Sequence, residues 1–441
     1  MRKKITTLMT IGLFSSAALV SHAQVELEPE KDTLTLMRER IDVNISKIQS
    51  LSKLKVSGYV QLQAEFGQYD TVAKAGASTK VGNATKYDEN IDGTDADSFM
   101  RYGIRRGRIK FDYAATSYSN VVFQLDITDG GIGFKDAYYQ VFIPCEHNLL
   151  LDKVIGFKFG IFDRPFGDEI SYSSSRRESP ERSIVFQKLF PDERDLGGML
   201  MLSAPKNTLF EGLKLDAGLF SGNGIRKDDN SKLDFIGHLK FDKKASTFSY
   251  GIGASYYNGS TNNAATELFT MKDNVWTPET VEANERNKRE YYGIDAQFSI
   301  ETFMGITNVR GEALGGTQPS TAGDIASPKG NTYDVAAPFN YNRKFKGGHI
   351  YFIQDIYKMP LTFVFKYCFL DPNIEVSGDN VTNKADLTAS TIGIGGLWRI
   401  SSAVRLQAFY EINKNETSGN ISAYKEDIRD NLFTLRLQYK F

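Results

Sequence analysis

Charged side chains concentrate between residues 164 and 194, where acidic and basic residues are equal in number. Guanidinium and ammonium groups bind anions through charge-assisted hydrogen bonds. A strict anion site needs basic groups whose charge is not compensated, because charge is costly to desolvate in a confined setting. The equal numbers therefore predict a segment of mixed charge. The basic residues are Arg164, Arg176, Arg177, Arg182, Lys188 and Arg194, and the acidic residues are Asp168, Glu169, Glu178, Glu181, Asp192 and Glu193.

Two interpretations of Arg176, Arg177 and Arg182 remain open. They contact a dissolved anion directly, or they pair with Glu178 and Glu181 and hold the segment in shape. If anions bind here, the candidate donors are Arg164, Arg176, Arg177, Arg182 and Lys188.

Catalytic and metal chemistry have little support in the sequence. His147, His238 and His349 have no Ser or Cys partner at a motif spacing for nucleophilic catalysis. Three aspartates between 92 and 97 lack the ordered spacing of a calcium loop. We therefore expect no enzymatic activity, no metal and no cofactor.

The elements that must position these residues are β-strands. From Lys55 onward apolar and polar residues alternate, which is typical of strands with one apolar and one polar face. The final strand shows the pattern best. Phe433, Leu435, Leu437, Tyr439 and Phe441 form its apolar face, and Thr434, Arg436, Gln438 and Lys440 form its polar face.

Sixteen such segments are predicted. In the second, the alternation slips at Arg105 and Arg106, which indicates a β-bulge. The predicted strands are 54–66, 99–113, 120–129, 134–144, 153–163, 195–205, 212–221, 231–243, 246–258, 289–300, 306–317, 345–357, 360–370, 387–400, 403–414 and 429–441.

The connections between these strands alternate between short turns and long polar loops. Short turns such as 244–245 and 401–402 alternate with long loops such as 164–194. This is the pattern of outer-membrane β-barrels, whose short turns face the periplasm. The alternative is a secreted β-sandwich, but a sandwich has no need of uniformly long strands or of a terminal aromatic residue such as Phe441. We predict an all-β, sixteen-stranded antiparallel transmembrane barrel over residues 54–441.

The N-terminus predicts export. A basic start at Met1–Lys4, an apolar stretch too short to span a membrane, and Ser21-His22-Ala23 fit a signal peptide over residues 1–23. Export permits disulfides. The predicted strands place Cys145 at a turn or facing outward, however, and Cys368 facing inward. We therefore expect two free thiols rather than a disulfide bridge.

Residues 24–53 contain no glycine and are predicted to form a short periplasmic helix. Leu34, Met37, Ile41, Ile48 and Leu51 recur at alternating steps of three and four residues, with Asn44 filling the step between Ile41 and Ile48. Two interpretations remain open: a short coiled coil or a single amphipathic helix that rests on the rest of the protein. The formal net charge of −1 argues against nucleic acid as a partner.

The sequence resembles the phosphate-selective porin O/P family, and the similarity runs from Gly58 to Phe441. The resemblance implies a sixteen-stranded, trimeric outer-membrane channel whose third extracellular loop folds inward and narrows the pore. That loop corresponds here to residues 164–194. The segments that carry the resemblance are Gly58–Gln63, Arg105–Ile109, Phe157–Gly167, Ser173–Arg177 followed by Glu181–Ser183, Asp195–Gly198 and Gly251–Gly259.

The sequence departs from the family in its charges. Phosphate-selective members are understood to use an arginine ladder and a lysine cluster, and no lysine cluster is present here. Acidic residues accompany the basic residues predicted to face inward, so the wall is also of mixed charge. The candidate wall residues are Arg106, Arg108, Lys158, Arg405 and Arg436.

We therefore expect a bacterial outer-membrane porin that passes small polar solutes and ions, with phosphate or other anions among them. The expected partners are membrane lipid, two further copies in a homotrimer, and the barrel-assembly machinery, which would read Phe441 as its signal. The alternative function is a surface adhesin or receptor that acts through its long loops.

Overall fold

The structure is a computed structural model that describes residues 37–38, 40–45, 52–68, 98–128, 131–145, 151–226, 228, 231–282, 285–328, 336 and 338–441. The chain divides into two units, residues 1–52 and 53–441. In the first unit, residues 37–38 and 40–45 are helical. The proposed signal peptide, the rest of the predicted helical seam and the aspartates between 92 and 97 lie outside the described residues.

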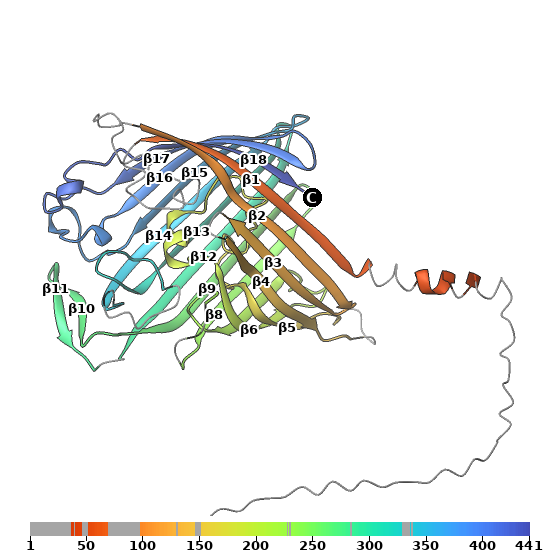
Figure 1. Ribbon diagram of the computed structural model, residues 1–441, viewed down its shortest axis with the longest axis horizontal. Helices are drawn as coiled ribbons and strands as arrows, with labels where there is room; N and C mark the ends of the chain where they lie inside the picture. Colours follow the sequence, from red (N-terminus) through yellow and green to blue (C-terminus); the bar gives the residue numbers. More distant parts are fainter. Residues whose placement is uncertain are drawn as a thin grey trace, which may run out of the picture. The chain divides into compact units, whose positions relative to one another are not determined.

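The second unit is a closed antiparallel β-barrel of sixteen wall strands, and two further strands form a hairpin (Figure 1). The predicted fold is therefore confirmed. The wall strands are β1 (Leu54–Gln68), β2 (Ser98–Thr116), β3 (Ser119–Thr128), β4 (Gly131–Phe142), β5 (Ile155–Asp163), β6 (Arg194–Ser203), β7 (Leu213–Phe220), β8 (Asp234–Lys244), β9 (Phe248–Asn262), β12 (Arg286–Thr302), β13 (Gly305–Ser320), β14 (Tyr341–Asp355), β15 (Leu361–Asp371), β16 (Ala389–Arg399), β17 (Val404–Asn415) and β18 (Leu432–Lys440).

The barrel closes where the first wall strand meets the last. Tyr59 of β1 is opposite Lys440 of β18, and Gly58 and Phe441 exchange two backbone hydrogen bonds of 3.0 Å. Closure leaves no free strand edge in the wall, which is a requirement for a sheet that crosses a bilayer.

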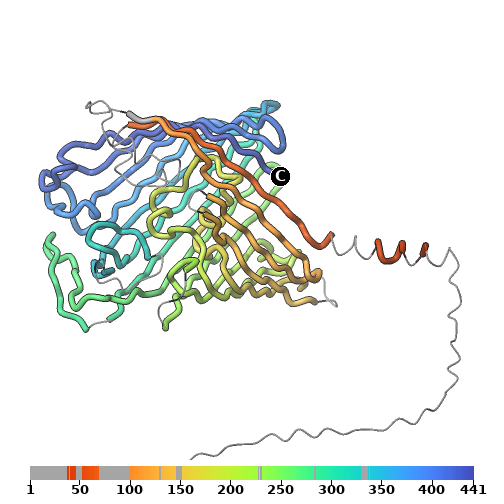
Figure 2. The backbone as a smooth tube through the Cα atoms, in the orientation of Figure 1, coloured from red at the N-terminus to blue at the C-terminus, as the bar shows by residue number. Residues whose placement is uncertain are grey.

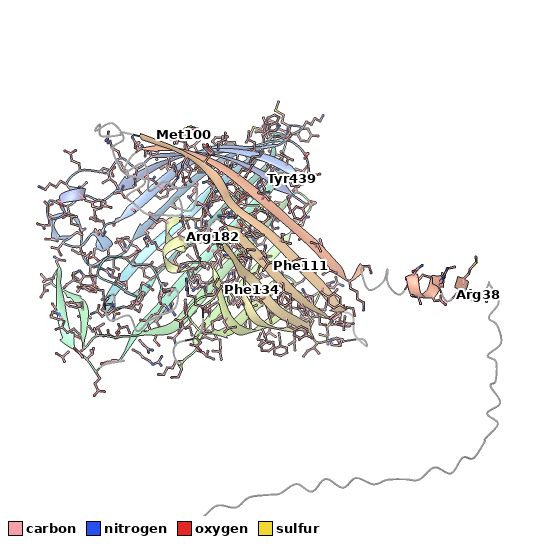
Figure 3. The ribbon with its side chains drawn as sticks, viewed as in Figure 1. Arg38, Met100, Phe111, Phe134, Arg182 and Tyr439 are labelled. Atoms are coloured by element: carbon pink, nitrogen blue, oxygen red, sulfur yellow. The ribbon has the colours of Figure 1, made fainter. Side chains whose placement is uncertain are left out.

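The two faces of the wall differ in chemistry as the alternation predicts. Large apolar side chains point outward, among them Met100, Phe111, Phe134 and Tyr439 (Figure 3). Polar side chains point inward and are buried, as Gln61 of β1 is. This arrangement, apolar outside and polar inside, is that of a transmembrane barrel. Among the described residues, no helix is long and apolar enough to cross a membrane.

The predicted bulge in β2 is confirmed. Gln61 is paired with Arg106, but the next residue of β1, Leu62, is paired with Ile104. Arg105 is the extra residue, so both Arg105 and Arg106 are buried, and both reach the same loop carboxylate inside the barrel.

One hairpin and several short helices are not part of the wall. β10 (Glu267–Lys272) and β11 (Val275–Thr280) pair with each other within a segment that the alternation left as a loop. The Trp276 indole of this hairpin donates a 2.9 Å hydrogen bond to Asp386. The helices are α3 (Ile184–Leu189) and the 3₁₀ turns η3 (Gly378–Asn380), η4 (Lys384–Asp386) and η5 (Ser422–Tyr424).

Candidate functional site

The candidate site is the segment of residues 164–193, which leaves the wall after β5 and crosses the barrel interior (Figure 2). We call it the crossing loop. The Gly167 amide donates to the Ser255 hydroxyl of β9 at 2.9 Å, and Ser174 Oγ lies 2.6 Å from the Tyr59 hydroxyl of β1. Because β1 and β9 lie on opposite sides of a sixteen-stranded wall, these contacts show that the loop spans the interior.

An apolar core fixes one side of the crossing loop. The ring centroids of Phe166 and Phe190 are 5.0 Å apart, and Phe190 lies 5.7 Å from Tyr291 of β12 and 6.1 Å from Tyr257 of β9. Phe186 of α3 joins the same cluster, and all five rings are buried. Burial of large aromatic side chains is the main source of stability in such contacts, so this cluster anchors the loop to the wall.

The loop also approaches the wall closely at Gly167. Its φ of +61° favours glycine, and a Cβ there would collide with the Glu312 carboxylate of β13. That carboxylate accepts hydrogen bonds from the backbone amides of Asp168 at 3.0 Å and Glu169 at 2.5 Å. Glu312 therefore fixes the backbone of the loop.

Three wall arginines converge on the carboxylate of Glu181 on the other side of the loop. Arg105 donates to both of its oxygens at 2.8 and 2.9 Å, and Arg436 of β18 donates to one at 2.8 Å. Arg106 is 3.2 Å away. Arg436 also donates to the carbonyl of Pro180 at 2.5 Å. The side chains of Arg106 and Arg436 are 6% and 2% exposed, so these are interior ion pairs.

The arginines keep Glu181 ionised. Burial raises the pKa of a carboxyl group, but the positive charges of Arg105, Arg106 and Arg436 outweigh it and hold the pKa of Glu181 well below its usual range. The loop therefore supplies a permanent negative charge that compensates the wall arginines.

Other acidic residues of the crossing loop also bind basic residues of the wall. Asp168 accepts a 2.6 Å hydrogen bond from Lys240 of β8, and Glu178 pairs with Arg310 of β13. Glu169 lies 3.5 Å from Nδ1 of the buried His349 on β14. Asp168 and Glu178 thus each compensate the positive charge of a wall side chain.

Three of the predicted loop donors have partners within the protein. Arg182 pairs with Glu193 and donates to the carbonyl of Glu169 at 2.8 Å, so the expected pairing of Arg182 with Glu178 or Glu181 is wrong. The reason is that α3 turns the chain back and brings Glu193 alongside. Arg164 lies over the Phe190 ring and donates to the Pro191 carbonyl at 3.2 Å. Lys188 pairs with Asp324 at 2.8 Å.

Arg176 and Arg177 differ from the other basic residues of the loop. Arg176 is exposed and lies 5.3 Å from the centre of the Tyr172 ring. Arg177 is 2% exposed, and its Nε and one terminal nitrogen have no hydrogen-bond partner. Within the described residues neither forms an ion pair within 4.0 Å. Both line a cavity of about 160 Å³ that Lys240 and Arg310 also line.

The predicted wall residues divide into three kinds. Arg106 and Arg436 bind Glu181, as described above. Arg108 pairs with Asp126 across neighbouring strands at 3.1 Å. Lys158 lies 4.9 Å from the centre of the Tyr138 ring, and Arg405 donates to the Ser174 carbonyl at 3.4 Å.

Sequence reasoning singled out neither the role of Arg105 nor that of Glu181. The slip of alternation at Arg105 was the signal for the first, because a bulge turns an extra side chain inward. No local signal marked Glu181, since its partners lie 76 and 255 residues away. Cys145 and Cys368 are free thiols as expected, and Cys368 is buried.

Neither a family model nor a curated protein matches the sequence. Solved structures do match in fold. Salmonella typhi OmpF in complex with daunomycin is 12% identical, with 88% of this chain and 97% of that chain covered and a TM-score of 0.50. Vibrio cholerae OmpT in its trimer form is 9% identical (88% and 99% covered, TM-score 0.49), and Pseudomonas putida OprB is 10% identical (91% and 97% covered, TM-score 0.49).

The chain thus shares the closed β-barrel fold of OmpF. Its closed wall, apolar outside and polar inside, makes the chain a transmembrane barrel of the bacterial outer membrane.

Proposed function

We propose that the protein is a passive diffusion channel for small polar solutes and ions, with weak rather than strict ion preference. The observation that carries the proposal is the crossing loop, whose acidic side chains bind the inward basic side chains of the wall. A loop that compensates charge in this way leaves the interior polar but without a large excess of either sign. Such a lumen suits general diffusion better than strict selection of one ion.

Anion contact in this proposal belongs to Arg176 and Arg177. Among the described basic residues of the crossing loop, Arg164, Arg176 and Arg177 have no ion pair, and of these only Arg176 and Arg177 line this cavity. Arg405 adds a third positive charge next to them through its contact with Ser174. Phosphate is a candidate anion because of the resemblance to phosphate-selective porins, but the arginines on Glu181 are already occupied by an internal carboxylate.

The assembly and partners of the barrel are also proposed. Residues 1–23 serve as an export signal, residues 24–53 form a periplasmic segment, and Phe441 is read during insertion. The family resemblance implies a homotrimer. No catalytic role is proposed.

Planar-bilayer recording tests the channel directly. Purified protein should give stable conductance steps, and phosphate should reduce the current only at high concentration. Phosphate block at low concentration, lost in Arg176→Ala, would show a dedicated anion filter. A barrel that inserts without conductance would contradict the proposal and favour the adhesin or receptor function.

A further inference from the structure

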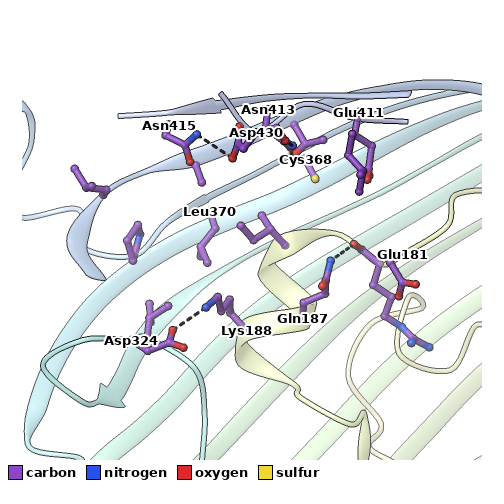
Figure 4. Close-up of a pocket in the computed structure, with 18 of the residues that line it drawn as sticks. Glu181, Gln187, Lys188, Asp324, Cys368, Leu370, Glu411, Asn413, Asn415 and Asp430 are labelled. Carbon is purple, nitrogen blue, oxygen red and sulfur yellow. Dashed lines mark hydrogen bonds and ion pairs between the residues drawn. The ribbon is translucent and has the colours of Figure 1, made fainter. Parts of the chain in front are cut away.

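A larger cavity, of about 370 Å³, lies between α3 of the crossing loop and the ends of β15 to β18 (Figure 4). Its lining comes from strand ends such as Leu370 of β15 and Asn413 of β17, and from the long loops that follow them. The cavity therefore opens at the end of the barrel that carries the long loops, and it lies between that end and the arginines that bind Glu181. A volume of this size is within the usual range for small-molecule sites.

One side of this cavity is aliphatic. Ile184 of α3, Ile325, Leu370, Leu387 and Leu432 all line it. They come from five different segments, so the apolar surface is assembled by the tertiary fold. Tyr424 is the one aromatic residue among the described residues of the lining, which gives little surface on which a sugar ring could stack. An aliphatic group is the better match for this side.

The charges deep in the cavity are paired within the protein. Lys366 binds Glu411 at 3.0 Å, and their side chains are only 2% and 13% exposed. Glu65 pairs with Arg101 at 2.5 Å, and Glu181 is held by the wall arginines. Among the described lining residues, a ligand with net charge would find no unpaired counter-charge at this depth and would lose its hydration. The depth of the cavity therefore disfavours a simple ion.

The mouth of the cavity is different, because its charges are accessible. Lys188 and Asp324 form an ion pair whose side chains are 34% and 50% exposed. Exposed pairs of this kind contribute little stability and exchange partners readily. Lys384, also in the lining, is exposed and has no ion pair among the described residues. The mouth thus offers both a positive and a negative group to a ligand.

We infer that this cavity binds a zwitterionic solute with an aliphatic side chain, such as a short apolar peptide. Its carboxylate would bind Lys188 or Lys384, its ammonium group would bind Asp324, and its side chain would lie against Leu370 and Ile184. A ligand of zero net charge suits the depth of the cavity, where the protein's charges are already paired. Its two charged groups suit the accessible charges at the mouth of the cavity. Binding at this cavity does not require conductance, so it is tested independently of the proposed channel.

The test is isothermal titration calorimetry of the detergent-solubilised full barrel with the dipeptide Leu-Leu. Trp276 provides a local reporter, because it bonds to Asp386, which lies between the lining residues Ala385 and Leu387. Its fluorescence is read in a Trp398→Phe background, since these are the two tryptophans of the chain. Glucose and inorganic phosphate are titrated as comparison probes.

Two variants locate the binding. Ala389→Phe adds a ring inside the cavity, and the matched control Ala313→Phe adds the same ring on the exposed outer face of β13. We expect saturable binding of Leu-Leu that weakens at least about tenfold in Ala389→Phe and is unchanged in Ala313→Phe. Lys188→Gln should weaken it by less, up to about fivefold, because the pair is exposed.

Any of three outcomes would overturn the inference. The first is that Leu-Leu shows no saturable binding, and the second is that Ala389→Phe leaves its binding unchanged. The third is that glucose or phosphate displaces Leu-Leu at comparable concentration. Glucose that binds in an Ala389-dependent manner while Leu-Leu does not would assign the cavity to sugars instead.

Discussion

The two sides of the crossing loop are held to the barrel by different physics. On one side, Phe166, Phe186 and Phe190 pack into an aromatic core with Tyr257 and Tyr291 of the wall. On the other, carboxylates such as that of Glu181 bind wall arginines. Apolar packing is insensitive to the identity of a passing ion, whereas paired charges set the field that an ion experiences. The comparison teaches that the aromatic core contributes only to the position of the loop, whereas the charge pairs both hold the loop and, in the proposed channel, set its ion preference.

The largest expected effect comes from the aromatic side. Phe190→Ala removes a buried ring, and such substitutions cost about 3–5 kcal/mol. We expect the barrel to remain inserted while the loop detaches, giving larger and noisier conductance and protease cleavage within residues 164–193. The control is Phe303→Ala, a ring that is 89% exposed in a turn. Unchanged conductance in Phe190→Ala would contradict the assignment of the anchor.

The second-largest effect should come from removing the carboxylate that the three wall arginines bind. Glu181→Ala removes the internal carboxylate and leaves Arg105, Arg106 and Arg436 with space for an external anion. We expect phosphate to reduce the current of this variant at concentrations roughly tenfold lower than in the native channel. Equal phosphate sensitivity in the two proteins would mean that Glu181 does not occupy an anion site. Asp324→Asn, which removes a carboxylate from an exposed pair, is the matched control.

A smaller effect is expected at Arg176, whose charge is exposed and unpaired among the described residues. Arg176→Gln should lower the anion-to-cation permeability ratio by roughly twofold, without a change in loop stability. Arg182→Gln, in contrast, breaks contacts with Glu193 and with loop carbonyls, so its main effect should be on protease resistance of the loop. The reverse pattern, in which Arg182 sets permeability and Arg176 sets loop stability, would contradict these assignments.

The smallest effect is that of pH near neutrality. The pKa of Glu181 is lowered in the folded protein, so its stabilising pairs are complete above the ordinary glutamate value of about 4.3 and are lost as pH falls through the lower folded value. Titration of this group should leave ion preference constant from pH 7 to about 5 and raise anion preference only in stronger acid. A reversal-potential series across this range checks it. A transition near pH 6 that Glu181→Gln abolishes would be incompatible with the account.

The wall of the barrel could be read from the sequence because it depends on local pattern. Side chains of a strand alternate between two environments, so apolar and polar residues also alternate. All sixteen wall strands and the bulge at Arg105 follow from that rule. The β10–β11 hairpin was missed because its strands are six residues each and lack an apolar face. Its two-residue turn, Asp273 and Asn274 with positive φ, was the available signal.

The charge partners could not be read in the same way. Glu181 finds Arg105 and Arg436 only because the closed barrel brings β2 and β18 to one side of the crossing loop. The sequence left two interpretations of Arg182 open, and the only acidic partners considered for it were its near neighbours Glu178 and Glu181. The equal count of charges in the loop was informative, but the identity of each pair depends on tertiary structure.

The most direct test of the central claim is the reversal potential across a planar bilayer in a potassium chloride gradient, compared between the native protein and Glu181→Gln. The claim is that the carboxylate of Glu181 compensates three wall arginines and keeps ion preference weak. We predict a potential near zero for the native channel and a clear shift toward anion selectivity for Glu181→Gln, with Glu279→Gln in the exposed hairpin unchanged. Strong anion selectivity in the native channel, or no shift in Glu181→Gln, would contradict the account.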